Sequence, residues 1–207
     1  DLTEPATLAP AFTGVDRVYL FAVPETAREV VALAEQAGVR RVVVLSAAAV
    51  TVGLDTYHHP RVEEAVRESG LEWTMVRPGE FMTNMLPIWA PSIRSARVVQ
   101  YPFAEQIGVP VHEADVAAVA VAALLEDRHI GAIYTLSGPA PITYRQQVQA
   151  IGAALGEEVR YEEVTREHAR DLLKAQGGTA ATNADLLLGF VDYGGADENC
   201  MSDKENL

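Results

Sequence analysis

Two kinds of hydrophobic pattern alternate along the first two thirds of the chain. Residues 17–23 (RVYLFAV) and 41–46 (RVVVLS) are nearly continuous apolar runs rich in β-branched residues, a pattern typical of strands buried on both faces of a parallel sheet. Between these runs, apolar residues recur at helical spacing and end before Gly38. The pattern predicts a strand–helix–strand unit whose helix begins with a capping box formed by Thr26 and Glu29.

The same alternation continues toward the C-terminus, where alternating strands and helices predict an α/β fold with a mainly parallel sheet. The further predicted elements are a helix over residues 60–69 closed by Gly70, a strand over 71–76, a helix from 116 with Asp115 as its N-cap, a strand over 132–138, and a helix that begins with a capping box of Thr143 and Gln146 and ends at Gly156.

Two segments break the alternation. Residues 79–110 mix Met, Trp, Phe and Pro without clear periodicity, so we expect a long irregular stretch that either walls a ligand pocket or packs on the core as an apolar loop. From residue 177 onward small and polar residues dominate, which predicts a frayed tail.

Charge and cysteine content narrow the classes of function. The formal net charge is −13, which repels phosphate backbones, so we expect no nucleic-acid partner. A single cysteine, Cys200, permits no disulfide within the chain and fits a reducing, cytoplasmic location. No uncharged apolar run approaches the roughly 18 residues that span a bilayer, so no membrane partner is expected.

The adjacent residues His58 and His59 raise the questions of a metal site and of a hydrolase. Neighbouring histidines point in different directions and rarely share one tetrahedral site, and no further His or Cys spacing supports them, so we expect no metal. Ser46 ends an apolar run upstream of His59 and Glu63. No G-x-S-x-G elbow surrounds that serine, so a Ser–His–acid hydrolase is not favoured.

Three motifs occur in a specific order: VVVLSAAA, then HHPRVEEAVRESGLEWTMVRPGEFMTN, then HEADVAAVAVAALL. This order resembles the NmrA-like branch of the atypical short-chain dehydrogenases/reductases, over residues 1–170. The resemblance implies a Rossmann-like α/β core over residues 1–138 with a substrate-loop insertion at 79–110 and a small C-terminal substrate lobe at 139–176. The flexible tail at 177–207 is predicted from composition alone. It implies NADP(H) or NAD(H) as the cofactor and a small apolar molecule as the ligand or substrate.

The resemblance also assigns residues. Reductases of this group carry a Tyr-x-x-x-Lys pair, and counting back from Glu63 puts His59 at the lysine position and Asp55 at the tyrosine position; the alternative for His59 is an ordinary histidine at a helix start. Catalysis is assigned to Ser46, His59 and Glu80. Cofactor binding is assigned to Asp1, Phe21, Ala22, Val23, Pro24, Ser46, His59, Pro78 and Phe81. Substrate binding is assigned to Phe81, Met82, Asn84, Met85 and Trp89.

One departure from the family lies at the front of the chain. The first strand of the family and its G-x-x-G-x-x-G turn, which binds the cofactor pyrophosphate, have no counterpart in these residues. We therefore expect an N-terminally truncated Rossmann-like sheet that binds the cofactor weakly or not at all by itself. Residues 17–23 would form an open edge strand, which predicts a homodimer or a missing N-terminal segment that covers it.

Two functions remain open at this point. The first is an NAD(P)H-dependent oxidoreductase of a small apolar molecule, either quinone-like or polyketide-like. The second is a non-redox descendant that has lost dinucleotide binding and serves as a cyclase, an isomerase or a ligand-binding regulator.

Overall fold

The computed structural model describes residues 1–189, which divide into two compact units. Unit 1 contains Asp1–Gly79 and Val111–Ser137, and unit 2 contains Glu80–Pro110 and the described residues from 138 onward. The chain therefore passes from one unit to the other three times. Cys200 and the rest of the predicted tail from residue 190 lie outside the described residues.

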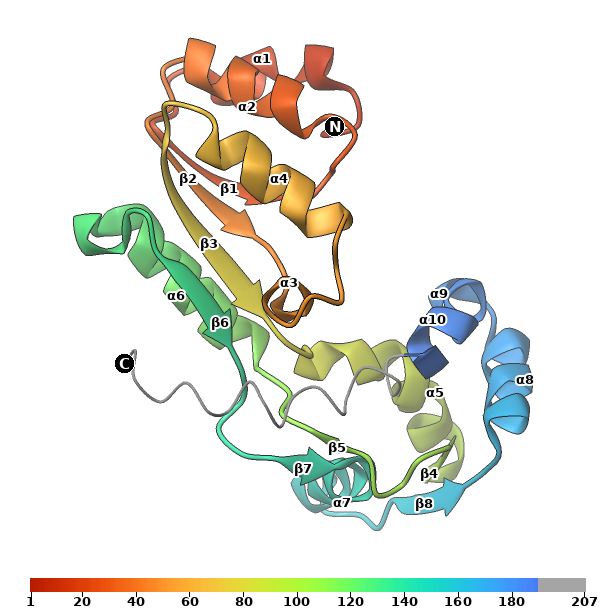
Figure 1. Cartoon of the computed structure of the whole chain (residues 1–207). Coiled ribbons are helices and arrows are strands. Elements are labelled where there is room, and N and C mark those ends of the chain that lie inside the picture. The colour runs from red at the N-terminus through yellow and green to blue at the C-terminus, as the bar shows by residue number, and fades with distance from the viewer. Residues whose placement is uncertain (190–207) are drawn as a thin grey trace. The chain divides into compact units, whose positions relative to one another are not determined.

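Unit 1 is built on a four-stranded parallel sheet in the order β1-β2-β3-β6 (Figure 1). Its strands are β1 (Arg17–Phe21), β2 (Arg41–Leu45), β3 (Glu72–Pro78) and β6 (Ile133–Leu136). Its helices are η1 (Pro5–Thr7), α1 (Ala9–Phe12), α2 (Ala27–Gln36), α3 (Ala48–Thr51), α4 (His58–Arg67), α6 (Glu113–Leu125) and η3 (Asp127–His129). The four strands predicted from the sequence are confirmed, and so are the predicted helices α2, α4 and α6, with ends that differ by a few residues.

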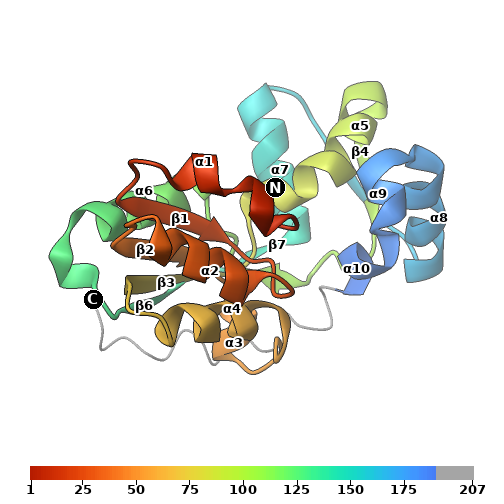
Figure 2. The same ribbon diagram turned by 90° about the horizontal axis from the view of Figure 1, so that it is seen from above.

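The sheet is covered on both faces, which explains why the inner strand β2 is apolar from Val42 to its end at Leu45. Val42 and Val44 pack into the core shared with α2 and α4, whereas Val43, on the opposite face by strand alternation, is buried where α6 covers the sheet (Figure 2). Burying each valine side chain contributes on the order of 1.5 kcal/mol. β1 is an edge strand of the sheet formed by the described residues.

The described part of unit 2 contains two small sheets, five α-helices and one 3-10 helix around a second core. Strands β4 and β8 pair in parallel, and β5 and β7 pair antiparallel. Its strands are β4 (Val98–Tyr101), β5 (Ile107–Gly108), β7 (Ile142–Thr143) and β8 (Arg160–Glu163). Its helices are η2 (Met82–Met85), α5 (Leu86–Ala96), α7 (Tyr144–Leu155), α8 (Arg166–Gln176), α9 (Gly178–Thr182) and α10 (Ala184–Gly189).

Two predictions about irregular segments were wrong. Residues 79–110 are not a structureless loop, because they form η2, α5, β4 and β5. Pro87 is accommodated because it occupies the first turn of α5, where its missing N–H has no intrahelical partner to lose, whereas Pro91 lies inside the helix. The predicted tail begins too early, because α9 and α10 follow residue 177 and bury Ala180, Ala184 and Leu188.

Helix caps were predicted with mixed success. The box of Thr143 and Gln146 is confirmed, with both of its reciprocal hydrogen bonds, and Gly156 ends the helix in the left-handed conformation. Thr26 makes no capping bond, because its hydroxyl donates instead to the carbonyl oxygen of Leu2 at 2.7 Å.

Asp115 does not cap the helix α6 either. The helix begins two residues earlier, at Glu113, and the ring nitrogen Nδ1 of His112 accepts the N–H of Ala114 at 3.0 Å. Asp115 therefore lies in the first turn, where its negative charge still interacts favourably with the N-terminal end of the helix dipole.

Candidate active site

The carboxyl ends of β1, β2 and β3 lie at one edge of the sheet in unit 1. Phe21 pairs with Leu45 and Leu45 with Val76 in the parallel register, and the N–H of Ser46 donates to the carbonyl oxygen of Val76 at 2.7 Å. Of the predicted cofactor residues, Phe21 ends β1 and residues 22–24 follow it directly, Ser46 follows β2, and Pro78 ends β3. In open α/β sheets this is the edge at which ligands bind.

A buried carboxylate, that of Glu63, holds this edge together. Glu63 is 0% exposed. Its Oε1 accepts hydrogen bonds from the Ser46 hydroxyl at 2.6 Å and from Nε of Arg77 at 2.8 Å. Its Oε2 accepts from Nη2 of Arg77 at 2.6 Å and from Nη2 of Arg67 at 2.7 Å. The Arg77 contact is the two-pronged guanidinium–carboxylate arrangement, which is among the strongest charged pairs in proteins.

The electrostatics of this cluster favour an ionised Glu63. Burial raises the pKa of the Glu63 carboxyl, but the hydrogen bonds from Arg77 and Ser46 and the charges of Arg77 and Arg67 outweigh it and lower the pKa below its ordinary value. The carboxylate can therefore only accept hydrogen bonds. It follows that the Ser46 hydroxyl proton points at Glu63.

Asp55 and His59 form a second polar pair, at the start of α4. The carboxylate of Asp55 accepts the backbone N–H groups of Tyr57, His58 and His59 at 2.8–3.0 Å, so its side chain satisfies the unpaired donors at this helix start. Its Oδ2 also lies 2.6 Å from Nδ1 of His59. Both side chains are only partly buried, with 16% of Asp55 and 24% of His59 exposed.

The hydrogen bonds also determine the charge of Asp55. Burial raises the pKa of the Asp55 carboxyl, but the backbone and ring hydrogen bonds from His59 and the backbone bonds from Tyr57 and His58 outweigh burial and lower the pKa to about 2. Asp55 is ionised at neutral pH. Sequence analysis did not predict that Asp55 caps α4, because only the structure shows that its side chain folds back onto the following helix.

The segment after β1 has a mixed character. Phe21 is 56% exposed and stacks edge-to-face on Tyr19 with ring centroids 5.4 Å apart, whereas Pro24 is buried. Asp1, expected near the adenine, accepts hydrogen bonds from the backbone and hydroxyl of Thr3 at 2.9 Å. The assignment of Asp1, Phe21 and Pro24 to cofactor binding stays a prediction.

The remaining predicted residues belong to unit 2, and the structure distributes them between surface and core. Met82 is exposed and Phe81 and Asn84 are half-buried, so these side chains are accessible in part. Met85 and Trp89 lie in the core of the unit, Trp89 with only 2% of its surface exposed. For these two the expectation of an accessible pocket wall is corrected, because their side chains are already covered by protein.

The core around Trp89 contains two tyrosines that the sequence did not single out. The rings of Trp89, Tyr101 and Tyr144 contact one another edge-to-face with centroids 5.7–6.1 Å apart. Burial and then the charge of Glu80 raise the pKa of both Tyr101 and Tyr144. Glu80, predicted to transfer protons, therefore lies near two phenols that remain protonated.

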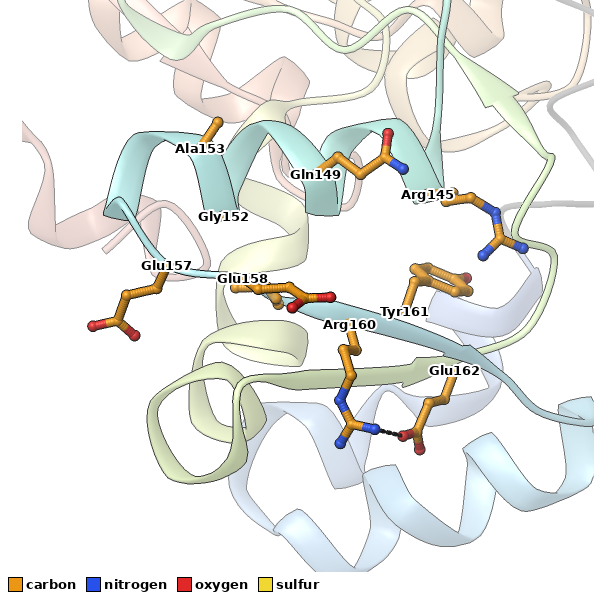
Figure 3. A pocket seen from close by; sticks show the side chains of 10 residues that line it. Arg145, Gln149, Gly152, Ala153, Glu157, Glu158, Arg160, Tyr161 and Glu162 are labelled. Atoms are coloured by element: carbon orange, nitrogen blue, oxygen red, sulfur yellow. Dashed lines mark ion pairs between the residues drawn. The ribbon is translucent and has the colours of Figure 1, made fainter.

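A hollow of about 500 Å³ lies elsewhere in unit 2, between α7 and β8 (Figure 3). The guanidinium of Arg145 lies over the ring of Tyr161, 5.4 Å from its centroid, and pairs with Glu105; Arg160 pairs with Glu162 at 3.2 Å. The hollow includes none of the residues predicted to act in catalysis or binding.

Neither a membrane-spanning helix nor a cluster of metal ligands occurs in the described part of the chain. Within residues 1–189, no helix combines the length and apolar character needed to cross a bilayer. Over the same residues, no group of three or more His, Cys, Asp or Glu side chains is arranged to hold a metal ion.

Comparison with known proteins decides the family. A protein family described as NAD(P)H-binding matches residues 1–127. The chain belongs to this NAD(P)H-binding, NmrA-like family. Within it, the chain is 43% identical over 180 residues to a (4-alkanoyl-5-oxo-2,5-dihydrofuran-3-yl)methyl phosphate reductase of Streptomyces griseus and 34% identical over 191 residues to an NAD(P)H azoreductase of Xenophilus azovorans. These alignments cover 84% and 86% of the chain, and 64% of the length of each relative.

Solved structures of the same fold bind nicotinamide cofactors. The NADPH complex of a quinone oxidoreductase from Escherichia coli is 26% identical, with a TM-score of 0.76 over 99% of this chain and 74% of that protein. The NADP(H) complex of a triphenylmethane reductase from Citrobacter, at 19% identity, shares the fold with a TM-score of 0.76 over 93% of this chain and 70% of that protein. The NmrA-like fold predicted from the ordered motifs is confirmed.

Proposed function

We propose that this NmrA-like chain carries catalytic residues of an NAD(P)H-dependent reductase that acts on a small, planar, electron-poor molecule of quinone-like or polyketide-like character. The observation that carries the proposal is the family match over residues 1–127, which contains the whole carboxyl edge of β1, β2 and β3. The names of the two curated relatives, a butenolide phosphate reductase and an azoreductase, support this class of reaction.

The residues at the sheet edge suit the nicotinamide end of such a cofactor. Phe21 exposes more than half of its surface at the end of β1, so an aromatic face is available to a flat ring. In the proposal, the backbone of residues 21–24 and the side chains of Ser46, His59 and Pro78, all in unit 1, contact the nicotinamide and its ribose. The cofactor supplies the hydride, and the protein holds the substrate and transfers the proton.

Ser46 has a supporting part in this proposal. Its hydroxyl proton is directed to Glu63 at 2.6 Å, so toward any other group the oxygen can act only as an acceptor, through its two lone pairs. An acceptor at the end of β2 suits a ribose hydroxyl or the carboxamide N–H of a nicotinamide. Ser46 is thus proposed to orient the cofactor, and proton donation falls to another group.

Direct hydride transfer is the property to test. Purified chain is incubated with NADPH and a quinone, an azo dye or an unsaturated lactone, and cofactor oxidation is followed by absorbance. NADPH deuterated at C4 is then used, and mass spectrometry of the lactone product shows whether deuterium has been transferred. We expect deuterium in the product and a fall in turnover for Ser46→Ala.

The control variant is Glu158→Gln, a carboxylate in the hollow between α7 and β8 that lies outside the proposed site. Its turnover should equal that of the unaltered chain. NMR spectra of the chain with and without NADPH provide a second measurement, because backbone signals of residues 21–24 and Ser46 should shift. Absence of both turnover and these shifts would contradict the proposal and favour the non-redox alternative, a cyclase, isomerase or ligand-binding regulator.

A further inference from the structure

The pair formed by Asp55 and His59 has a property that the proposed reductase function does not by itself require. The side chain of Asp55 is ionised and can only accept hydrogen bonds, and its Oδ2 lies 2.6 Å from Nδ1 of His59. Nδ1 must therefore carry a hydrogen. In the neutral ring, this leaves Nε2 as the nitrogen without a proton; in the cationic ring, Nε2 carries the only proton not already donated to Asp55.

The surroundings of His59 leave Nε2 available. None of the described side chains or backbone groups forms a hydrogen bond with it, and about a quarter of the side chain is exposed. The neighbouring His58 ring contacts the His59 ring edge-on, with centroids 4.9 Å apart, and makes no hydrogen bond to Nε2 among the described residues. Asp55 itself is fixed by three backbone N–H groups at the start of α4.

We propose that Asp55 is a positioning residue that fixes the Nδ1–H tautomer of His59, so that Nε2 of His59 delivers the proton that completes substrate reduction. This inference rests on the proposed reductase function. As hydride reaches an electron-poor carbon of the substrate, the displaced electron pair moves to the substrate oxygen. Protonated His59 transfers its Nε2 proton to that oxygen, NAD(P)⁺ is left as the oxidised product, and the neutral ring regains a proton from water.

The Asp55–His59 pair can supply the proton that the phenol of a tyrosine at position 55 would otherwise donate. Asp55 lies four residues before His59, one helical turn away, and together they form a carboxylate–imidazole pair of the kind that holds one tautomer of a histidine in other enzymes. A lysine at position 59 would present a freely rotating ammonium group instead, with no fixed nitrogen of this kind.

The substitution Asp55→Asn tests the positioning and keeps two of the three backbone hydrogen bonds of the helix cap, because only the N–H of His59 loses its acceptor Oδ2. The amide oxygen in place of Oδ1 still accepts the N–H groups of Tyr57 and His58, and asparagine is an effective N-cap. The amide NH₂ then replaces Oδ2 and donates to Nδ1 of His59. We expect the neutral ring to switch to the Nε2–H tautomer.

Nitrogen-15 NMR of the imidazole rings measures this directly, in the chain without cofactor and under conditions in which the shifts report a neutral ring. In the unaltered chain Nδ1 of His59 should show the shift of a protonated nitrogen, and in Asp55→Asn that shift should move to Nε2. His58→Gln is the matched control, because it removes the neighbouring ring and keeps the backbone N–H that Asp55 accepts. It should leave the His59 tautomer unchanged.

Turnover with NADPH and a quinone then links the tautomer to the reaction. Asp55→Asn should lower kcat at least about tenfold with an unchanged dissociation constant for NADPH, His59→Gln should lower kcat at least as much, and His58→Gln should leave it unchanged. An unaltered tautomer in Asp55→Asn overturns the inference whether or not the chain is a reductase. If Asp55→Asn switches the tautomer of His59 but leaves kcat unchanged, the inference is also overturned. A switched tautomer in a chain that transfers no hydride supports the positioning and refutes the proposed function.

Discussion

Replacing Glu63 by glutamine should destabilise unit 1 far more than the loss of one exposed charge. The substitution preserves the size of the side chain and one acceptor oxygen, which can still serve Ser46 and Nε of Arg77. The new NH₂ group, however, faces Nη2 of Arg77 and Nη2 of Arg67, both of which are donors. Two charged hydrogen bonds are lost and two donors are brought together.

The magnitude follows from the burial of the cluster. Glu63 is fully buried and only 12% of the Arg77 side chain is exposed, so the guanidinium keeps its charge without a counter-charge or much water. Breaking a buried pair in this way costs about 3–5 kcal/mol. For a protein of this size, 1 kcal/mol corresponds to about 2–4 °C, so we expect the melting temperature to fall by about 6–20 °C.

Urea unfolding followed by circular dichroism at pH 7 measures the free energy of unfolding. The matched control is Glu64→Gln, one residue away, because the Glu64 carboxylate is 57% exposed and pairs with Arg28 on the surface at 3.3 Å. The control should leave the urea midpoint unchanged within error. A loss below about 1 kcal/mol for Glu63→Gln would refute the view that the cluster holds the edge together.

The pH dependence provides an independent check of the sign. Because the pKa of Glu63 is lower in the folded chain than in the unfolded chain, the stability it contributes is fully present above the unfolded value of about 4.3 and is lost as pH falls through the lower folded value. Glutamine does not titrate. The difference between the two proteins should therefore shrink below about pH 4, and a difference that stays constant down to pH 3 would contradict the assignment.

Three other predictions concern the core, the cofactor and the open edge. Trp89→Ala should cost about 3–5 kcal/mol of unfolding free energy, because it empties a core position; Leu86→Ala on the exposed face of α5 is the control, and a small loss measured by urea unfolding would return Trp89 to the ligand surface. Calorimetry should show that the chain binds NADPH at least about 100-fold more weakly than the E. coli quinone oxidoreductase does. The reason is that the sequence has no glycine-rich turn, and two charged hydrogen bonds to phosphate are worth about 3 kcal/mol or more. Equal affinity would contradict this expectation. Light scattering after size exclusion should show self-association, because β1 leaves unpaired backbone groups along one edge, whereas a stable monomer of 22.3 kDa would exclude it.

The elements that the sequence predicted well are those whose pattern is local. Residues 42–45 are apolar throughout because both faces of β2 are covered, and this burial is visible in the sequence as an unbroken run. The capping box of Thr143 and Gln146 involves only groups three residues apart, so its bonds also follow from local sequence. Ordered motifs then identified the family, which no single motif did.

The elements that the sequence did not predict depend on partners far along the chain. β4 pairs with β8, about 60 residues later, so nothing near residues 98–101 marks it as a strand. Thr26 precedes α2 but does not cap it, and its hydroxyl donates to the carbonyl oxygen of Leu2, 24 residues earlier in the chain. The role of Asp55 was likewise hidden, because a carboxylate before a helix looks the same whether or not a histidine ring lies within 2.6 Å of it.

The three passages of the chain between the units have a consequence for how the protein is made. Residues 1–79 are synthesised before residues 80–110 of unit 2, but the four described strands of unit 1 can all pair only after β6 at residues 133–136 has been made. The two later passages then lie against each other, since the N–H of Gly138 donates to the carbonyl oxygen of Val109 at 2.9 Å and a Cβ atom at 138 would overlap the carbonyl oxygen of Pro110. Neither unit is a continuous segment that a gene fragment could encode alone, so the two must mature together as one translation product.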